Sequence, residues 1–135
     1  MPASETISKT RNVVFGLTGA VCIVYGALAL TMGRPDPMPF WIPGVLGLLA
    51  AIILVIGSVI AGAEQSKMAW DEGYLSEQRR AAEIAFWVGI IVHFILSMLL
   101  LGGMIEINAG FVASGILPAG VYLMLIVWFG ARDQS

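Results

Sequence analysis

A charged segment runs directly into a long apolar one within residues 66–103, SKMAWDEGYLSEQRRAAEIAFWVGIIVHFILSMLLLGG. The charged part carries Lys67, Arg79 and Arg80, and the apolar part holds the only histidine of the chain, His93. Two further apolar stretches precede this segment and one follows it. A change from charged to apolar sequence that lasts about 20 residues is typical of a helix that enters a lipid bilayer.

The composition favours lipid over water as the main solvent. Hydrophobic residues make up 59% of the 135 positions, charged residues make up 12%, and the mean hydropathy is +0.90. So little polar surface cannot cover a soluble domain. We therefore predict an all-α membrane protein, a single domain over residues 1–135, with a linker at 64–76 and four transmembrane helices at about residues 13–32, 41–63, 77–104 and 109–130.

The distribution of basic residues predicts the orientation. With four crossings, Arg34 stands alone on one side of the membrane, and six basic residues lie on the other: Lys9, Arg11, Lys67, Arg79, Arg80 and Arg132. Cytoplasmic loops carry the excess of lysine and arginine, so both termini and the linker are expected in the cytoplasm. The helices then form two antiparallel hairpins in a multi-pass plasma-membrane protein.

A cleaved signal peptide is the alternative for the first apolar block. Two basic residues precede about thirteen apolar ones, and Ala27-Leu28-Ala29 has the form of a cleavage site. The apolar run continues to Met32, however, and that length favours a transmembrane helix.

Small residues predict how the helices pack. They recur at spacings of three and four in the first two helices, at Gly19, Cys22 and Gly26, and at Gly44, Gly47, Ala51 and Ser58, with Leu54 interrupting the second series. Such seams let backbones approach closely in a membrane, so we expect the first two helices to form a tight pair. In the third helix, Ala85, Gly89, His93 and Ser97 are predicted to face the interior. The last helix lacks a clean seam and is expected at the periphery.

Polar side chains at one depth suggest a cluster in the middle of the membrane. Tyr25, His93 and Tyr122 lie roughly 15–21 Å from the nearest cytoplasmic arginine at 1.5 Å per residue. We predict that His93 bonds a tyrosine hydroxyl, with Ser97 one turn further on. An intramembrane histidine serves either as a proton relay or ligand, or as a neutral hydrogen-bonding group that only fixes the bundle.

Other chemistries find little support in the residues. A haem with two histidine ligands needs a second histidine, from another copy of the chain, and a zinc site needs three or four clustered ligands. No phosphate-binding loop or nucleophile motif is present, and the net charge of −2 does not favour nucleic acid. We predict no enzyme activity, no cofactor and no metal.

The linker is the predicted partner contact, through Trp70, Asp71, Glu72 and Tyr74. It forms either a short surface helix with its aromatic side turned to the membrane, or an irregular segment, because Gly73 weakens a helix. Ser76, followed by Glu77, is the predicted start of the third long helix.

The order Asp71-Glu72, Arg79-Arg80 and Ala85-Phe86 resembles a group of uncharacterised small four-helix bacterial inner-membrane proteins. The resemblance covers about residues 64–132 and implies a bacterial inner-membrane location with four helices, but no activity. Residues 40–44, FWIPG, with the preceding proline-rich loop, are similar to the small membrane subunit of tripartite tricarboxylate transporters.

These observations predict a non-catalytic structural or accessory membrane subunit, in contact with lipid and with another membrane protein or a second copy of itself. The competing function is a small transporter, or a membrane subunit of one, built around the midplane cluster. Transport ranks second because the chain has no acidic residue at the midplane.

Overall fold

The computed structural model describes residues 2–133, and its regular structure is entirely helical within that range. The five helices are α1 (Ala3–Met32), α2 (Trp41–Ala61), α3 (Ala63–Ala69), α4 (Glu72–Leu101) and α5 (Ile107–Asp133). With α3 and α4 taken together, four helices are long and apolar enough to cross a membrane. The predicted all-α fold with four membrane-compatible helices is therefore confirmed.

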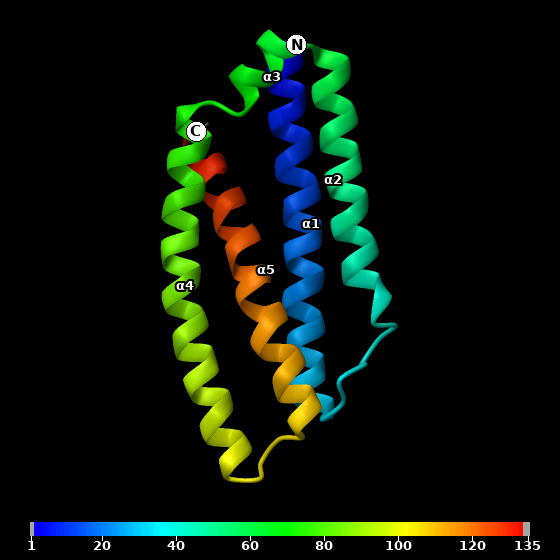
Figure 1. Cartoon of the computed structure of the whole chain (residues 1–135), viewed down its shortest axis with the longest axis vertical. Coiled ribbons are helices and arrows are strands. Elements are labelled where there is room, and N and C mark those ends of the chain that lie inside the picture. The colour runs from blue at the N-terminus through cyan, green and yellow to red at the C-terminus, as the bar shows by residue number, and fades with distance from the viewer. Residues whose placement is uncertain (1, 134–135) are drawn as a thin grey trace.

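The C-terminal helix is the centre of the bundle. Helix α5 makes its main contacts with α1 and with α4, while α2 packs against α1 and α3. Figure 1 shows the long helices in the order α4, α5, α1 and α2, with both chain termini and α3 at one end, termed here the terminal end. The expectation that the last helix packs at the periphery is therefore wrong.

Close packing between α1 and α5 explains this central position. A Cβ atom built on Gly120 would lie 3.0 Å from the Gly19 carbonyl oxygen and 3.1 Å from Cys22 Cβ. A Cβ atom on Gly26 would lie 2.5 Å from Leu117 Cδ2. The small residues of α1 thus form the predicted seam, but the partner of that seam is α5.

Helix α4 packs on the other side of α5 through small residues and Pro118. Ala81, Ala85 and Leu96 of α4 are buried. A Cβ atom on Gly89 would meet the Pro118 ring at 3.6 Å, which is ordinary van der Waals contact. Gly89 is therefore part of a packed seam, as predicted.

The glycines of α2 meet open space. A Cβ atom on Gly44, Gly47 or Gly57 would have no neighbouring atom within 4 Å. Only Ala50 and Leu54 are buried in this helix, and Ala51 is exposed. The predicted tight seam between the first two long helices is therefore wrong, because α5 occupies the matching surface of α1.

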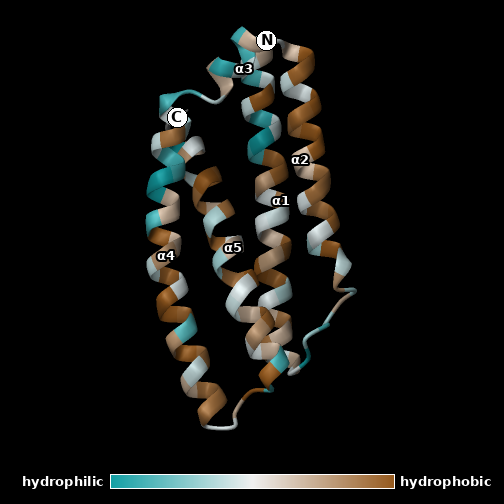
Figure 2. Cartoon of the chain, in the orientation of Figure 1, coloured by the Kyte–Doolittle hydropathy of each residue, from teal (hydrophilic) through white to brown (hydrophobic). Residues whose placement is uncertain are grey.

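Helix α2 is displaced along the bundle. Thr10 and Ile53 line the same groove, yet Thr10 lies 22 residues from the end of α1 at Met32, and Ile53 lies 12 residues from the start of α2 at Trp41. This difference sets the start of α2 about 15 Å nearer the terminal end than the end of α1, at 1.5 Å per residue. Figure 2 shows the result: α2 is hydrophobic up to the end where α1, α3 and α4 are hydrophilic.

The helix starts differ from the predicted ones for identifiable reasons. Helix α1 begins at Ala3 rather than near residue 13, because its polar first turns are packed, with Ile7 and Arg11 buried. Helix α4 begins at Glu72 rather than at Ser76, since the Asp71 carboxylate accepts a hydrogen bond from the Tyr74 N–H at 3.1 Å.

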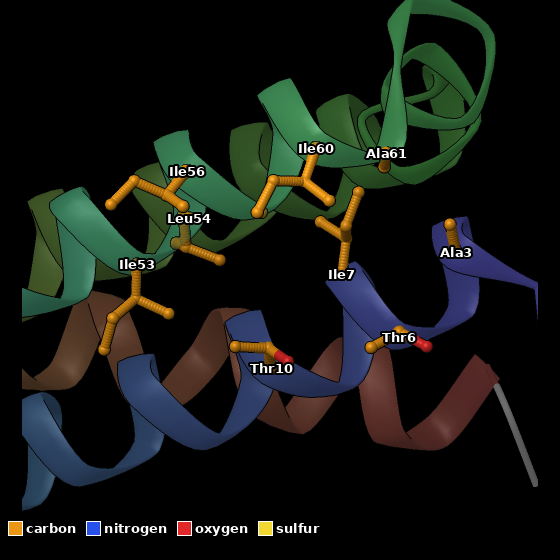
Figure 3. A pocket seen from close by; sticks show the side chains of 10 residues that line it. Ala3, Thr6, Ile7, Thr10, Ile53, Leu54, Ile56, Ile60 and Ala61 are labelled. Carbon is orange, nitrogen blue, oxygen red and sulfur yellow. The ribbon is translucent and has the colours of Figure 1, made fainter.

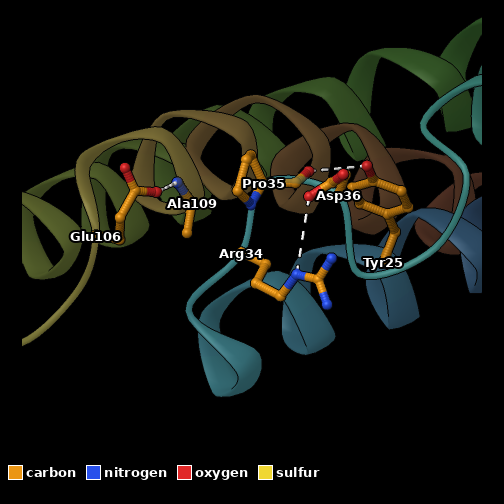
Figure 4. Close-up of polar contacts among 6 residues, drawn as sticks. All are labelled: Tyr25, Arg34, Pro35, Asp36, Glu106 and Ala109. Atoms are coloured by element: carbon orange, nitrogen blue, oxygen red, sulfur yellow. Dashed lines mark hydrogen bonds and ion pairs between the residues drawn. The ribbon is translucent and has the colours of Figure 1, made fainter.

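The opposite end holds two loops, each fixed by a side chain. The Glu106 carboxylate accepts from the Ala109 N–H at 2.8 Å and so caps the start of α5 (Figure 4). The Tyr25 hydroxyl donates to the Pro35 carbonyl at 2.8 Å and holds the proline-rich loop against α1. Arg34 and Asp36 of that loop lie 4.0 Å apart and are exposed.

Candidate functional site

The predicted midplane cluster is not assembled. The Tyr25 side chain is buried and bonds the loop carbonyl of Pro35, and Tyr122 packs near Tyr74, Ile126 and Phe129 at the terminal end. Within residues 2–133 the His93 imidazole makes no hydrogen bond with a tyrosine, so that prediction is wrong.

His93 and Ser97 do lie together, on a small cavity. They line a space of about 130 Å³ between α4 and α5, together with Ser114. His93 is exposed rather than interior. A repeat of four residues drifts by about 40° per step on a helix of 3.6 residues per turn, and so His93 is rotated off the face that buries Ala85. Leu96, eleven residues after Ala85, keeps that face and is buried.

The most organised polar group of the protein surrounds Arg11, which is only 4% exposed. Its Nη1 donates to the Ala69 carbonyl at 2.8 Å. Its guanidinium carbon lies 4.2 Å from the Tyr74 ring centroid and 5.2 Å from that of Trp70. We name Arg11, Ala69, Trp70 and Tyr74 the Arg11 clasp, because these residues join α1 to the segment that links α3 and α4.

The clasp also reaches α2. The Trp70 indole Nε1 donates to the Ser58 hydroxyl at 3.2 Å, and the Trp70 and Tyr74 rings meet edge to face with centroids 4.9 Å apart. Two cation–π contacts at roughly 0.5–2 kcal/mol each, together with a charge-assisted hydrogen bond, offset part of the cost of burying the arginine.

The clasp retains one unsatisfied donor. Arg11 Nε and the neighbouring Asn12 Oδ1 are buried and make no hydrogen bond within the described part of the chain. Arg11 also lines a cavity of about 260 Å³ at the terminal end, together with Asp71, Glu77 and Gly130. A buried polar atom without a hydrogen-bond partner is uncommon in folded proteins.

The four residues of the predicted partner contact differ in exposure. Tyr74 is buried and Trp70 is half-buried, so only part of the Trp70 ring is available on the surface. Asp71 caps α4, and only Asp71 and Glu72 of the four predicted residues are exposed. Sequence reasoning counted Arg11 as a membrane anchor and missed its role. The signal was present in Trp70 and Tyr74, an aromatic pair four residues apart within a polar segment.

A second cavity lies beside the first, between the ends of α4 and α5. It measures about 250 Å³ and is lined by Glu77, Arg80, Phe129 and Arg132 among others. The Arg80 guanidinium carbon stacks 4.7 Å from the Phe129 ring centroid. Gly73 and Glu77 line both cavities, so the two spaces are adjacent.

An apolar groove of about 670 Å³ runs between α1 and α2 (Figure 3). Ile7 and Leu54 are its buried residues, and Ile53, Ile56 and Ile60 form the α2 wall. Among residues 2–133, no charged side chain lines it. The groove results from the displacement of α2, which leaves branched aliphatic side chains beside the polar first turns of α1.

Metal chemistry has no assembled ligand set in the described residues. No group of three or more His, Cys, Asp or Glu side chains within residues 2–133 could hold a metal ion. Cys22 is a buried free thiol. The described residues offer cationic cavities and apolar surfaces, which can bind anionic and apolar groups.

Comparison with known proteins identified no relative of the chain. The two resemblances drawn from the sequence stay predictions. No protein-family model, no curated protein and no solved structure matches the chain.

Proposed function

We propose that the protein is a non-catalytic structural or accessory subunit of a bacterial inner membrane, which binds another membrane protein or a second copy of itself through α2. In this proposal the long helices form two antiparallel hairpins, and the terminal end faces the cytoplasm. The basic residues support the orientation, since six of the seven belong to the segments at that end and only Arg34 to the opposite loops.

The observation that carries the proposal is the open small-residue surface of α2. The glycines at the crossing of α1 and α5 are packed against backbone atoms, whereas Gly44 and Gly47 have no neighbouring side chain. Small residues allow helices to approach each other closely in lipid, where no hydrophobic effect drives association. An unused surface of this kind suits a helix of a partner.

The displacement of α2 adds a second argument. Val55, Val59 and Ile60 are 63%, 75% and 81% exposed at the end where the other helices are polar. Where this end of α2 lies in the polar headgroup layer, these side chains would forgo roughly 3–7 kcal/mol, from about 1.5–3 kcal/mol for a fully buried side chain scaled by their exposed fractions. A partner that covers the end of α2 in that layer would recover this free energy.

The test is a paired substitution. Gly44→Leu with Gly47→Leu in the full chain is expected to leave the fold intact and to abolish co-purification of the partner in mild detergent, as read by mass spectrometry. Gly115→Leu is the matched control, because Gly115 is exposed on α5 and equally without neighbours. Identical co-purification by both variants would argue against binding through α2.

A transport role is the second candidate, and the cavity beside His93 is the observation that favours it. At about 130 Å³ that cavity is smaller than the 300–1,000 Å³ typical of small-molecule sites, which is why transport ranks second. If His93→Ala changes the uptake of a solute while the α2 variant does not change co-purification, the transport function gains.

A further inference from the structure

Three arginines from three helices line the two adjacent cavities at the terminal end. Arg11 of α1 lies on the first cavity, and Arg80 of α4 and Arg132 of α5 lie on the second. Asp71 and Glu77 are the carboxylates on the same walls. Three positive charges against two negative ones leave one net positive charge, so the walls balance a ligand that carries a single negative charge.

The arginines suit a phosphodiester. A guanidinium presents a planar fork of N–H donors that matches two phosphate oxygens. Arg80 already has its plane supported by Phe129 at 4.7 Å, which lowers the conformational freedom it would lose on binding. Arg11 lines the neighbouring cavity and adds a positive charge to its wall.

The position of the cavities corresponds to the headgroup layer. Trp128 precedes Phe129 on α5 and is 61% exposed, as expected of an aromatic residue at a membrane boundary. Phe86 and Trp87 are exposed further along α4, toward the apolar part of the bundle. Phosphate oxygens held by Arg80 and Arg132 would leave the acyl chains beside these apolar side chains.

We propose that the paired cavities bind the phosphodiester group of one anionic phospholipid, with Arg80 and Arg132 as its main contacts. This inference rests on the membrane location in the proposed function but not on the partner bound through α2. Basic pockets between transmembrane helices are a known type of site for anionic headgroups. The shared chemistry would also admit free phosphate, and the experiment separates the two sources.

The experiment uses the full chain in detergent with phosphatidylglycerol, phosphatidylcholine or inorganic phosphate as the added probe. Native mass spectrometry then measures the fraction of the protein that carries one lipid. We expect phosphatidylglycerol to be retained in preference to phosphatidylcholine. Arg80→Gln and Arg132→Gln are each expected to weaken retention about tenfold or more, as the loss of one charge-assisted hydrogen bond would do.

Arg79→Gln is the matched control, because it removes the same charge from the neighbouring position, which does not line either cavity. Equal loss in Arg79→Gln and Arg80→Gln would overturn the site in favour of general surface charge. Displacement of the lipid by an equal concentration of inorganic phosphate would overturn the lipid source. If Arg80→Gln does not fold, Arg132→Gln still tests the site. Co-purification of the α2 partner with either variant would show that a loss of lipid binding is independent of the proposed function.

Discussion

Adding one methyl group at Gly120 should destabilise the protein, while the same change at Gly115 should not. The Gly120 Cβ would lie 2.7 Å from Ile23 Cγ1, 3.0 Å from the Gly19 carbonyl oxygen and 3.1 Å from Cys22 Cβ. The Ile23 side chain can move, but the Gly19 carbonyl belongs to the backbone of α1 and cannot. The Gly115 Cβ would meet no atom within 4 Å.

The two variants isolate the packing cost because both sit within α5. Each Gly→Ala change gains roughly 0.5–1 kcal/mol from reduced backbone freedom, and this gain cancels in their difference. The remaining difference is the overpacking cost, about 1–3 kcal/mol, with Gly120→Ala the less stable. The assay is unfolding of the purified chain in mixed micelles, with the free energy extrapolated to the absence of denaturing detergent.

A third variant compares the two possible pairings of α1. Close packing of α1 on α2 would make Gly47→Ala destabilising, whereas the open space around Gly47 makes it neutral or slightly stabilising. Equal stability of Gly115→Ala and Gly120→Ala, or a loss confined to Gly47→Ala, would refute the central position of α5.

The Arg11 clasp and the cap of α4 give three further expectations. Trp70→Phe keeps an aromatic ring but removes the hydrogen bond to Ser58, so it should lower the free energy of unfolding by about 1 kcal/mol. Adding Ser58→Ala to this variant should lower it little further. Arg11→Lys keeps the charge but loses the planar contact with Tyr74, and a stability loss of about 1–2 kcal/mol is expected in the same assay. Asp71→Ala should lower stability by about 0.5–2 kcal/mol, while Asp71→Asn should keep most of the cap. Unchanged unfolding of Arg11→Lys would mean that the stacked geometry contributes nothing.

Hydropathy alone predicted the four apolar helices, because a run of about 20 apolar residues has few other solutions. Hydropathy could not predict which helices pack against each other. A seam of small residues shows that a helix can be approached closely but does not identify the partner, and α1 could have used Gly47 of α2 as well as Gly120 of α5. The predicted interior position of His93 was wrong for a different reason. Residues spaced four apart rotate by about 40° per step around the helix, so they leave one face within three steps.

The polar start of α1 was missed because its residues bury themselves through tertiary contacts that leave no periodic signal. Residues 3–12 contain only a few apolar side chains, yet Arg11 is buried by the rings of Trp70 and Tyr74, some 60 positions later. Arg11 is buried by the segment between α3 and α4, which is distant in the sequence. A local sequence pattern therefore could not predict this burial.

The attachments of α2 connect the fold to the proposed function. Helix α5 packs closely on α1 at Gly19 and Gly120 and contacts α4 on its other side, whereas α2 buries Ala50 and Leu54 on one face and accepts a hydrogen bond from Trp70 at Ser58. The loop before it is fixed at Pro35 by Tyr25, well before α2 begins at Trp41. The open glycines of α2 thus lie on a helix that the rest of the chain buries on one face only. Because close packing of backbones is what drives helix association in a membrane, a partner helix that filled the open space beside these glycines would gain contacts that the chain itself does not supply.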